Sequence, residues 1–114
     1  MTKIKTLIVD DHQVVLDGIQ SMLDQDAEIA VVKVVINAES ALDFLKSNTV
    51  NVAIVDVNLP GMDGLELCKI ITKKYVNTKV LALTTFNESS IISGMMKNGA
   101  SGYLLKNTSS TELI

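Results

Sequence analysis

The sequence of 114 residues contains one cysteine, no arginine and no long apolar run. The single Cys68 excludes an intrachain disulfide framework and is typical of a reducing compartment. Because no uninterrupted apolar run exceeds four residues, nothing in the sequence predicts a membrane span. The start, MTKIKTLIVDD, reaches two carboxylates after only three consecutive apolar residues, too few for a signal peptide. We therefore expect a soluble, cytoplasmic protein with no membrane partner.

The chain is acidic: ten basic residues, all of them lysine, stand against 13 acidic ones, for a net charge of −3. A chain of this charge has no positive field to attract a nucleic-acid backbone, so we do not expect it to bind DNA by itself. Its hydrophobic content of 47% and charged content of 20% are typical of a globular protein and exclude disorder. The length suits one domain with its own core.

Short apolar, β-branched runs alternate along the chain with stretches of helical spacing. The runs that predict strands are residues 4–9, 30–36, 52–55, 79–83 and 102–105. The four helices between them are predicted by Val15, Ile19 and Met22, by Ala38, Ala41, Leu42 and Leu45, by Leu67, Ile70 and Ile71, and by Ile91 and Met95. This alternation, with strands that lack polar residues at every second position, predicts a doubly wound α/β fold whose parallel sheet is covered on both faces.

The helix ends carry their own signals. Asp63, three residues before Glu66, resembles a capping box at the start of the third helix, and Asn98-Gly99 predicts a left-handed turn at the end of the fourth. Residues 108–114 (TSSTELI) have the pattern of a cap followed by one helical turn, which is too short to cover its side of the sheet. We expect one domain over residues 1–114 with a truncated fifth helix.

Polar residues that carry chemistry follow four of the predicted strands. These residues are Asp10 and Asp11, Asp56, Thr84 and Lys106. A single Asp after a strand is most often a turn residue. Because the carboxyl ends of parallel strands share one edge, however, all five side chains should converge on one pocket at the switch point of strand order. Their convergence predicts a functional site.

Three carboxylates in one pocket need compensating positive charge. At a separation of ~4 Å and an effective dielectric constant of ~20, each like-charge pair costs roughly 4 kcal/mol. Lys106 offsets part of this repulsion, and a divalent cation offsets more; clustered oxygen ligands with room for water suit Mg²⁺. A carboxylate beside Mg²⁺, a hydroxyl and a lysine is an arrangement for accepting a phosphoryl group. Asp56 is the best nucleophile, since it is central in the sheet and precedes a Gly/Pro-rich loop at residues 59–64.

Four segments together resemble the receiver domains of two-component response regulators, over nearly the whole chain. They are LIVDDH (7–12), IVDVNLPGMDGLEL (54–67), LALTTF (81–86) and NGASGYLLK (98–106). The resemblance implies a flavodoxin-like five-stranded sheet of order 2-1-3-4-5. It is strongest to the subfamily that carries a LuxR/NarL-type helix-turn-helix output domain after the receiver. DNA binding is then implied only for that output domain, which is absent from these residues.

The resemblance also implies a role for individual residues. Asp56 matches the phosphoacceptor, Asp11 a direct Mg²⁺ ligand and Asp10 its water-mediated neighbour, while Asn58 would offer its backbone carbonyl to the metal. The remaining roles fall to Thr84 as the switch hydroxyl, Lys106 as the phosphate-contacting lysine and Tyr103 as the aromatic that turns inward in the active state. A sensor histidine kinase would supply the phosphoryl group, and phosphorylation could produce a homodimer.

This chain departs from the family's pattern at three places. Asn107 follows the lysine where many receivers have proline, so a cis peptide is not expected there. Thr85 stands where many receivers have alanine, and its greater bulk could slow phosphoryl transfer. The short fifth helix leaves open any dimer interface that would use it.

Two other functions use the same pocket. A phosphohydrolase would also form an aspartyl-phosphate, but we would expect a second acid two residues beyond the nucleophile, where this chain has Asn58. A degenerate receiver would act only as a docking module, yet every acidic residue of the pocket is present. A signalling domain that assists its own phosphorylation and dephosphorylation, and that is not an enzyme, is therefore the favoured interpretation.

Other residues have a simpler interpretation than a functional one. His12 could relay protons or bind metal, but a polar residue in the first turn of a solvated helix is the simpler role. Cys68 borders the apolar stripe of its helix and is interpreted as packing. We interpret Met95 and Met96 as core and edge residues, and Lys69, Lys73 and Lys74 as a solvated helix face.

Overall fold

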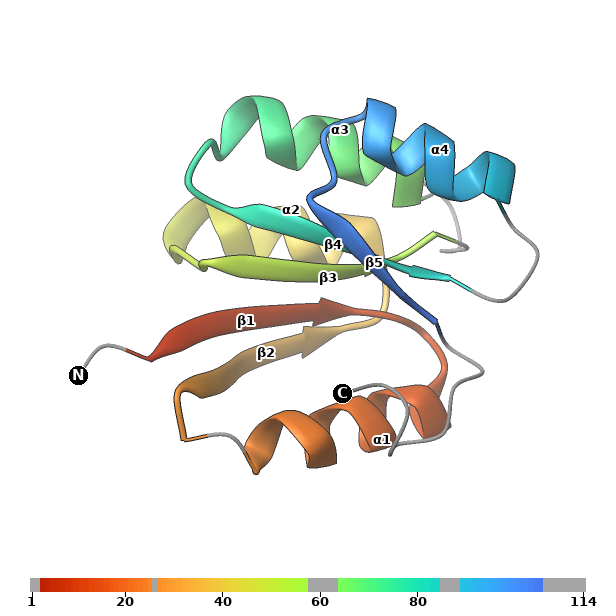
Figure 1. Ribbon diagram of the computed structural model, residues 1–114. Coiled ribbons are helices and arrows are strands. Elements are labelled where there is room, and N and C mark those ends of the chain that lie inside the picture. Colours follow the sequence, from red (N-terminus) through yellow and green to blue (C-terminus); the bar gives the residue numbers. More distant parts are fainter. Residues whose placement is uncertain (1–2, 26, 58–63, 85–88, 106–114) are drawn as a thin grey trace.

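The computed structural model describes residues 3–25, 27–57, 64–84 and 89–105 (Figure 1). Within these ranges the elements in chain order are β1 (Ile4–Val9), α1 (Gln13–Asp24), β2 (Ile29–Val35), α2 (Ala38–Ser47), β3 (Val52–Asp56), α3 (Gly64–Lys74), β4 (Lys79–Thr84), α4 (Ser89–Lys97) and β5 (Gly102–Leu105). The predicted strands are confirmed to within one residue at each end. No helix in the described part of the chain is long and apolar enough to cross a bilayer.

The five strands form one sheet in the order β2-β1-β3-β4-β5, and every pairing is parallel. A parallel pair cannot be joined by a hairpin, so each of β1, β2, β3 and β4 is followed by a crossover helix. The predicted 2-1-3-4-5 order is therefore confirmed. β2 carries one extra residue: Thr6 pairs with Val31 and Leu7 with Lys33, which leaves Val32 as a bulge on this edge strand.

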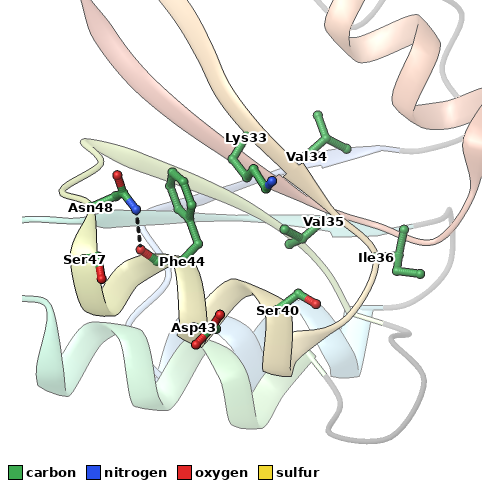
Figure 2. Close-up of a pocket in the computed structure, with 9 residues that line it drawn as sticks. All are labelled: Lys33, Val34, Val35, Ile36, Ser40, Asp43, Phe44, Ser47 and Asn48. Carbon is green, nitrogen blue, oxygen red and sulfur yellow. Dashed lines mark hydrogen bonds between the residues drawn. The ribbon is translucent and has the colours of Figure 1, made fainter.

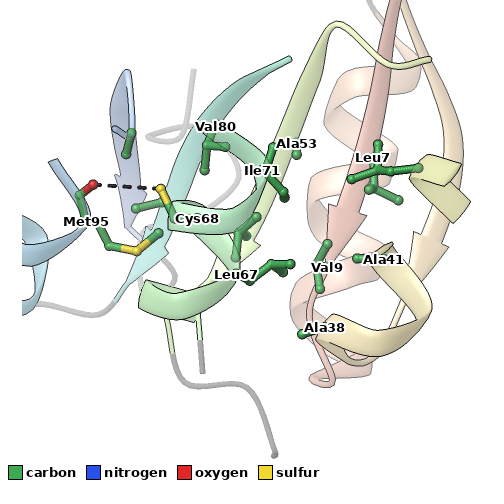
Figure 3. Close-up of a cluster of buried hydrophobic side chains, with 14 of the residues drawn as sticks. Leu7, Val9, Ala38, Ala41, Ala53, Leu67, Cys68, Ile71, Val80 and Met95 are labelled. Carbon is green, nitrogen blue, oxygen red and sulfur yellow. Dashed lines mark hydrogen bonds between the residues drawn. The ribbon is translucent and has the colours of Figure 1, made fainter. Parts of the chain in front are cut away.

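Helices cover both faces of the sheet, as predicted. In Figure 1, α3 and α4 lie above the sheet, α2 lies behind β3 and β4, and α1 lies below; the buried residues of α2 join those of α3 and α4 in one core, so these three helices cover the same face. The larger core, between the sheet and the upper helices, includes Leu7, Val9, Ala53, Leu67, Ile71, Val80 and Met95 (Figure 3). The smaller core includes Ile8, Leu16, Ile19, Ile54 and Leu83, with Leu81 and Leu104 only partly buried. Because the strands are apolar on both faces, neither face can turn to solvent without exposing core residues.

The helix-end predictions that the structure tests are confirmed at Gly99. This residue ends α4 with a φ of 106°, in the left-handed region that glycine adopts without strain. Asp63, the predicted cap of α3, lies outside the described residues, as do residues 108–114 of the fifth helix. The side chains of Val15, Met22 and Ile91 are also outside the described part.

Hydrogen bonds fasten the carboxyl-terminal end of α4 to α3. The side-chain amide of Asn98 donates to the carbonyl of Leu65 at 2.8 Å. The hydroxyl of Thr72 donates to the carbonyl of Asn98, also at 2.8 Å. A Cβ added at Gly99 would lie 2.8 Å from Thr72, so the two helices are in close contact at this point. This junction, formed by Leu65, Thr72, Asn98 and Gly99, holds the carboxyl-terminal end of α4 against α3, just before the chain enters β5.

Candidate functional site

Strand register brings two carboxylates together at the carboxyl edge of the sheet. Val9 of β1 pairs directly with Val55 of β3, so the next residues, Asp10 and Asp56, emerge side by side. The side chains of both are fully buried. Burial without a charged or hydrogen-bonding partner is costly for a carboxylate, so the surroundings of this pair decide what it can do.

The segment after β1 folds back over this pair. One carboxylate oxygen of Asp10, Oδ1, accepts a hydrogen bond from the backbone N–H of His12 at 2.8 Å, which forms a tight Asx turn. The backbone carbonyl of His12 then accepts from Leu16, which starts α1. Asp11, between them, is more exposed, with 37% of its side chain accessible. The turn therefore brings the side chains of Asp10, Asp11 and His12 together at the carboxyl edge of the sheet.

His12 lies in this pocket, which sequence reasoning missed. Its Nδ1 atom lies 2.8 Å from Asp10 Oδ1, 3.2 Å from Asp11 Oδ1 and 3.5 Å from Asp56 Oδ2. An ionised carboxylate can only accept, so Nδ1 is the donor of this hydrogen bond when Asp10 is ionised. The side chain is 52% exposed, so about half of it contacts solvent, as the sequence interpretation expects, and the rest faces the carboxylates. The available signal was its position directly after two carboxylates.

The donor set fits a divalent cation. One ligand atom from each of Asp10, Asp11, His12 and Asp56 lies within 4.8 Å of all the others. Three carboxylates in such a volume repel one another by several kcal/mol even at an effective dielectric constant of ~20. Hard oxygen donors, two of them buried and one at the surface, suit Mg²⁺, which keeps several of its waters. The structure therefore brings together Asp10, Asp11 and Asp56, as the sequence predicts.

The other predicted site residues divide into those that the structure describes and those that it does not. Asp56 pairs with Leu83, so Thr84 follows one position later at the end of β4, where it is fully buried. Tyr103 lies on the edge strand β5, opposite Ala82, and 51% of it is exposed. Asn58 and Lys106 lie outside the described residues, as does Thr85.

Gly64, the first residue of α3, packs against the backbone at the end of β3. An added Cβ would lie 2.6 Å from Cα of Val57 and would also overlap the carbonyl oxygen of Asp56. The N–H of Gly64 donates to the carbonyl of Val57 at 3.3 Å. Only a residue without a side chain lets α3 begin this close to the pocket, a requirement that the sequence did not reveal.

The simpler interpretations of the remaining candidates are confirmed. Cys68 is fully buried in the larger core, where its thiol lies 3.8 Å from the carbonyl oxygen of Met95 (Figure 3). Burial raises the pKa of the Cys68 thiol to about 11. Met95 is buried, Met96 is 44% exposed, and the lysines of α3 are exposed.

A separate surface hollow lies between β2 and α2 (Figure 2). Lys33 and Asp43 are the charged residues among those that line it, together with Val34, Val35, Ile36, Ser40, Phe44, Ser47 and Asn48. The amide of Asn48 is already used, since it donates to the carbonyl of Phe44 at 3.0 Å. This lining offers no cluster of ligand atoms comparable to the pocket at the strand ends, which is the better candidate site.

Comparison with known proteins agrees with this geometry. Residues 6–114 match the family described as the response regulator receiver domain. The chain belongs to the response regulator receiver domain family. This receiver domain is 35% identical, over 111 residues and 97% of its length, to the transcriptional regulatory protein LnrK of Bacillus subtilis (strain 168). It covers 50% of LnrK, and so spans about half the length of the curated relatives that it matches.

Solved structures show the same fold. The signal receiver domain of NarL from Mycobacterium tuberculosis superposes with a TM-score of 0.89 at 28% identity, covering 99% of this receiver domain and 91% of that chain. RcsB from Salmonella enterica serovar Typhimurium, bound to promoter rprA in the presence of the phosphomimetic BeF₃⁻, gives a TM-score of 0.88 at 29% identity. That match covers 98% of this receiver domain and 64% of the RcsB chain. The relatives are therefore NarL-type transcription regulators.

Proposed function

We propose that this receiver domain accepts a phosphoryl group on Asp56 and that this modification controls an output. The observation that carries the proposal is the burial of Asp56 beside Asp10, with the donor atoms of Asp11 and His12 within 4.8 Å. Two adjacent buried carboxylates have little structural use in a sheet, whereas a metal-assisted phosphoryl acceptor requires them.

The residues of the pocket divide the work of this transfer. A carboxylate oxygen of Asp56 attacks the phosphorus atom, and the leaving group departs on the opposite side. Asp10, Asp11, Asp56 and the backbone carbonyl of Asn58 would hold Mg²⁺, which supplies positive charge to the phosphoryl oxygens. Thr84, at the end of β4, and Lys106, which follows Leu105 in the sequence, would bind the phosphoryl group once it is formed. Movement of Thr84 toward it would let Tyr103, now half-exposed, turn inward.

The partners follow from the family and from the length of the relatives. A sensor histidine kinase would donate the phosphoryl group, and the receiver would act in the cytoplasm, where such kinases present their phosphohistidine. Because the chain spans half of LnrK, a DNA-binding output domain would follow it in the whole protein. The RcsB structure with promoter DNA and a phosphomimetic supports this arrangement. Phosphorylation could then favour a homodimer by shifting the population between two states.

Incubation with acetyl phosphate and Mg²⁺, followed by intact-mass measurement, tests the proposal. We expect one added phosphoryl group in the native chain and none in Asp56→Asn or in the presence of a chelator. Equal addition to Asp56→Asn would refute the assignment. Release of phosphate from small esters over many turnovers would instead favour a phosphohydrolase, and failure to bind millimolar Mg²⁺ would favour a docking module.

A further inference from the structure

The position of the His12 imidazole carries an inference beyond the phosphoacceptor role. Nδ1 lies 2.8, 3.2 and 3.5 Å from one oxygen of each of three carboxylates, from Asp10, Asp11 and Asp56. Half of the His12 side chain is open to solvent, so its position in the sequence does not by itself force the ring against the carboxylates. A nitrogen donor is therefore part of the same cluster as the oxygen donors.

The spacing of these atoms matches the ligands of a six-coordinate cation. Ligands held about 2.0–2.2 Å from a metal ion lie about 3 Å apart when adjacent and about 4.2 Å apart when opposite. The three distances from Nδ1 match adjacent ligands, and the limit of 4.8 Å on every pair leaves only small movements to reach the opposite ones. The four donor atoms are therefore close enough to share one ion.

The type of donor atom determines which metal ion would bind more tightly with His12 among its ligands. Carboxylate, carbonyl and water oxygens suit Mg²⁺, whereas imidazole suits Zn²⁺, Ni²⁺, Cu²⁺ and iron. We infer that His12 is a metal ligand that lets this pocket bind a transition-metal dication, with Nδ1 and the carboxylates of Asp10, Asp11 and Asp56 as the donor set. To ligate, the neutral imidazole takes the tautomer in which the proton of Nδ1 has moved, through solvent, to Nε2, so that the lone pair of Nδ1 is donated to the metal. This inference rests on the pocket being the metal site of the proposed function.

The rest of the described chain offers little competition for such an ion. The sequence contains one histidine and one cysteine. The cysteine, Cys68, is fully buried in the core and its pKa is raised, so its thiol does not provide an alternative ligand in the folded protein. A transition metal that binds this chain through an imidazole must therefore use His12.

Binding of this kind would oppose phosphorylation. Asp10, Asp11 and Asp56 belong to the donor sets of both ions, so an ion held by them and by His12 excludes the Mg²⁺ that would assist the transfer. Zn²⁺ should therefore reduce labelling by acetyl phosphate at constant Mg²⁺. Removal of the imidazole should relieve that inhibition, because the oxygen donors that remain favour Mg²⁺.

The decisive experiment compares the untagged native chain with His12→Asn, whose side-chain amide reaches the position of Nδ1 without an imidazole lone pair. Zn²⁺ affinity is measured by competition with a chromophoric chelator and Mg²⁺ affinity by calorimetry. The single imidazole is followed by ¹⁵N NMR, which reports ligation directly. We expect a Zn²⁺-dependent shift of Nδ1, a loss of Zn²⁺ affinity of at least about tenfold in His12→Asn, and a change in Mg²⁺ affinity of about twofold or less.

The outcomes separate this inference from the proposed function. The inference would be overturned if Zn²⁺ affinity were unchanged in His12→Asn, or if the Nδ1 resonance did not shift when Zn²⁺ is added. Mg²⁺-dependent labelling of Asp56 in the same protein would still support the proposed function. Equal increases in the affinity of His12→Asn for Zn²⁺ and Mg²⁺ would also overturn the inference, since they would show that His12 in the native chain only neutralises the carboxylates. Failure of the native chain to bind either ion would refute the metal site itself, and with it the metal-assisted transfer.

Discussion

Replacing Gly64 by alanine should weaken both the fold and the pocket, although alanine is the better helix former. Gly64 begins α3 against the end of β3. An added Cβ would lie 2.6 Å from Cα of Val57 and 2.9 Å from the carbonyl carbon of Asp56. These are backbone atoms, which cannot move aside as a flexible side chain can. Gly18, inside α1, is the matched control, because a Cβ there meets nothing within 4 Å.

The two substitutions should change stability in opposite directions. At Gly18, alanine should add about 0.5–1 kcal/mol to the free energy of unfolding, since it lowers the backbone entropy of the unfolded chain. At Gly64 the same gain is outweighed by overpacking, which costs about 1–3 kcal/mol. We expect Gly64→Ala to lose about 1–2 kcal/mol, which places the two variants roughly 2–3 kcal/mol apart.

Urea unfolding with a common slope for all three proteins measures this difference. In thermal unfolding, each kcal/mol corresponds to a shift of about 4 °C or more for a domain of this size. Labelling with acetyl phosphate adds a functional readout: Gly64→Ala should be slower than the native chain, because the contact is with the backbone of Asp56, and Gly18→Ala should not. A Gly64→Ala protein as stable as Gly18→Ala would refute the close approach of α3 to β3.

Three further perturbations test other parts of the structure. Thr72→Val removes the hydroxyl that donates to the carbonyl of Asn98 at 2.8 Å, and should cost about 0.5–1.5 kcal/mol in urea unfolding, whereas Thr72→Ser should cost less. The pKa of Cys68 is about 11 against an ordinary 9.0, so between these values the folded state holds a proton that the unfolded state has lost. The stability of the native chain relative to Cys68→Ala should therefore be constant below pH 8 and fall by up to about 2 kcal/mol as pH rises from 9 to 11; a constant difference would contradict this burial. Asp56→Asn should raise stability in a chelator by about 1–3 kcal/mol, because it removes a like charge from the pocket, and should lessen the stabilisation by Mg²⁺ seen in thermal unfolding.

Sequence reasoning predicted the sheet well because both faces of the central strands are largely buried. Residues 52–55 are apolar at every position and residues 79–83 at every position after Lys79, a pattern that differs from helical spacing, and the structure extends each run by one residue. The resemblance to receivers supplied the strand order, which the periodicity alone did not. Asp10, Asp11 and Asp56 converge as predicted, because residues that follow parallel strands share an edge whatever the details of the loops.

The features that sequence reasoning missed depend on local backbone geometry. His12 was interpreted from its own polarity, but the Asx turn made by Asp10 is what turns its ring toward the carboxylates. The need for glycine at position 64 arises from the distance between α3 and β3, and no periodicity reports such a distance. In both cases the deciding contact joins a residue to a neighbour whose position is fixed by the tertiary fold.

The packing of the sheet explains how like charges can be held together at all. A slip of one residue between β1 and β3 would turn Leu7, Ile8 and Val9 to the wrong faces, so the apolar core fixes the register in which Val9 meets Val55. Burying three such side chains contributes several kcal/mol, at about 1.5–3 kcal/mol each, enough to hold Asp10 beside Asp56 against their repulsion. The core thereby maintains a pocket that is electrostatically unfavourable by itself and becomes favourable when positive charge enters. His12 Nδ1 lies beside Asp10 and Asp56 in the described structure, and a divalent cation followed by a phosphoryl group would change the charge of this pocket, which is how a change at one carboxylate can bias the whole domain.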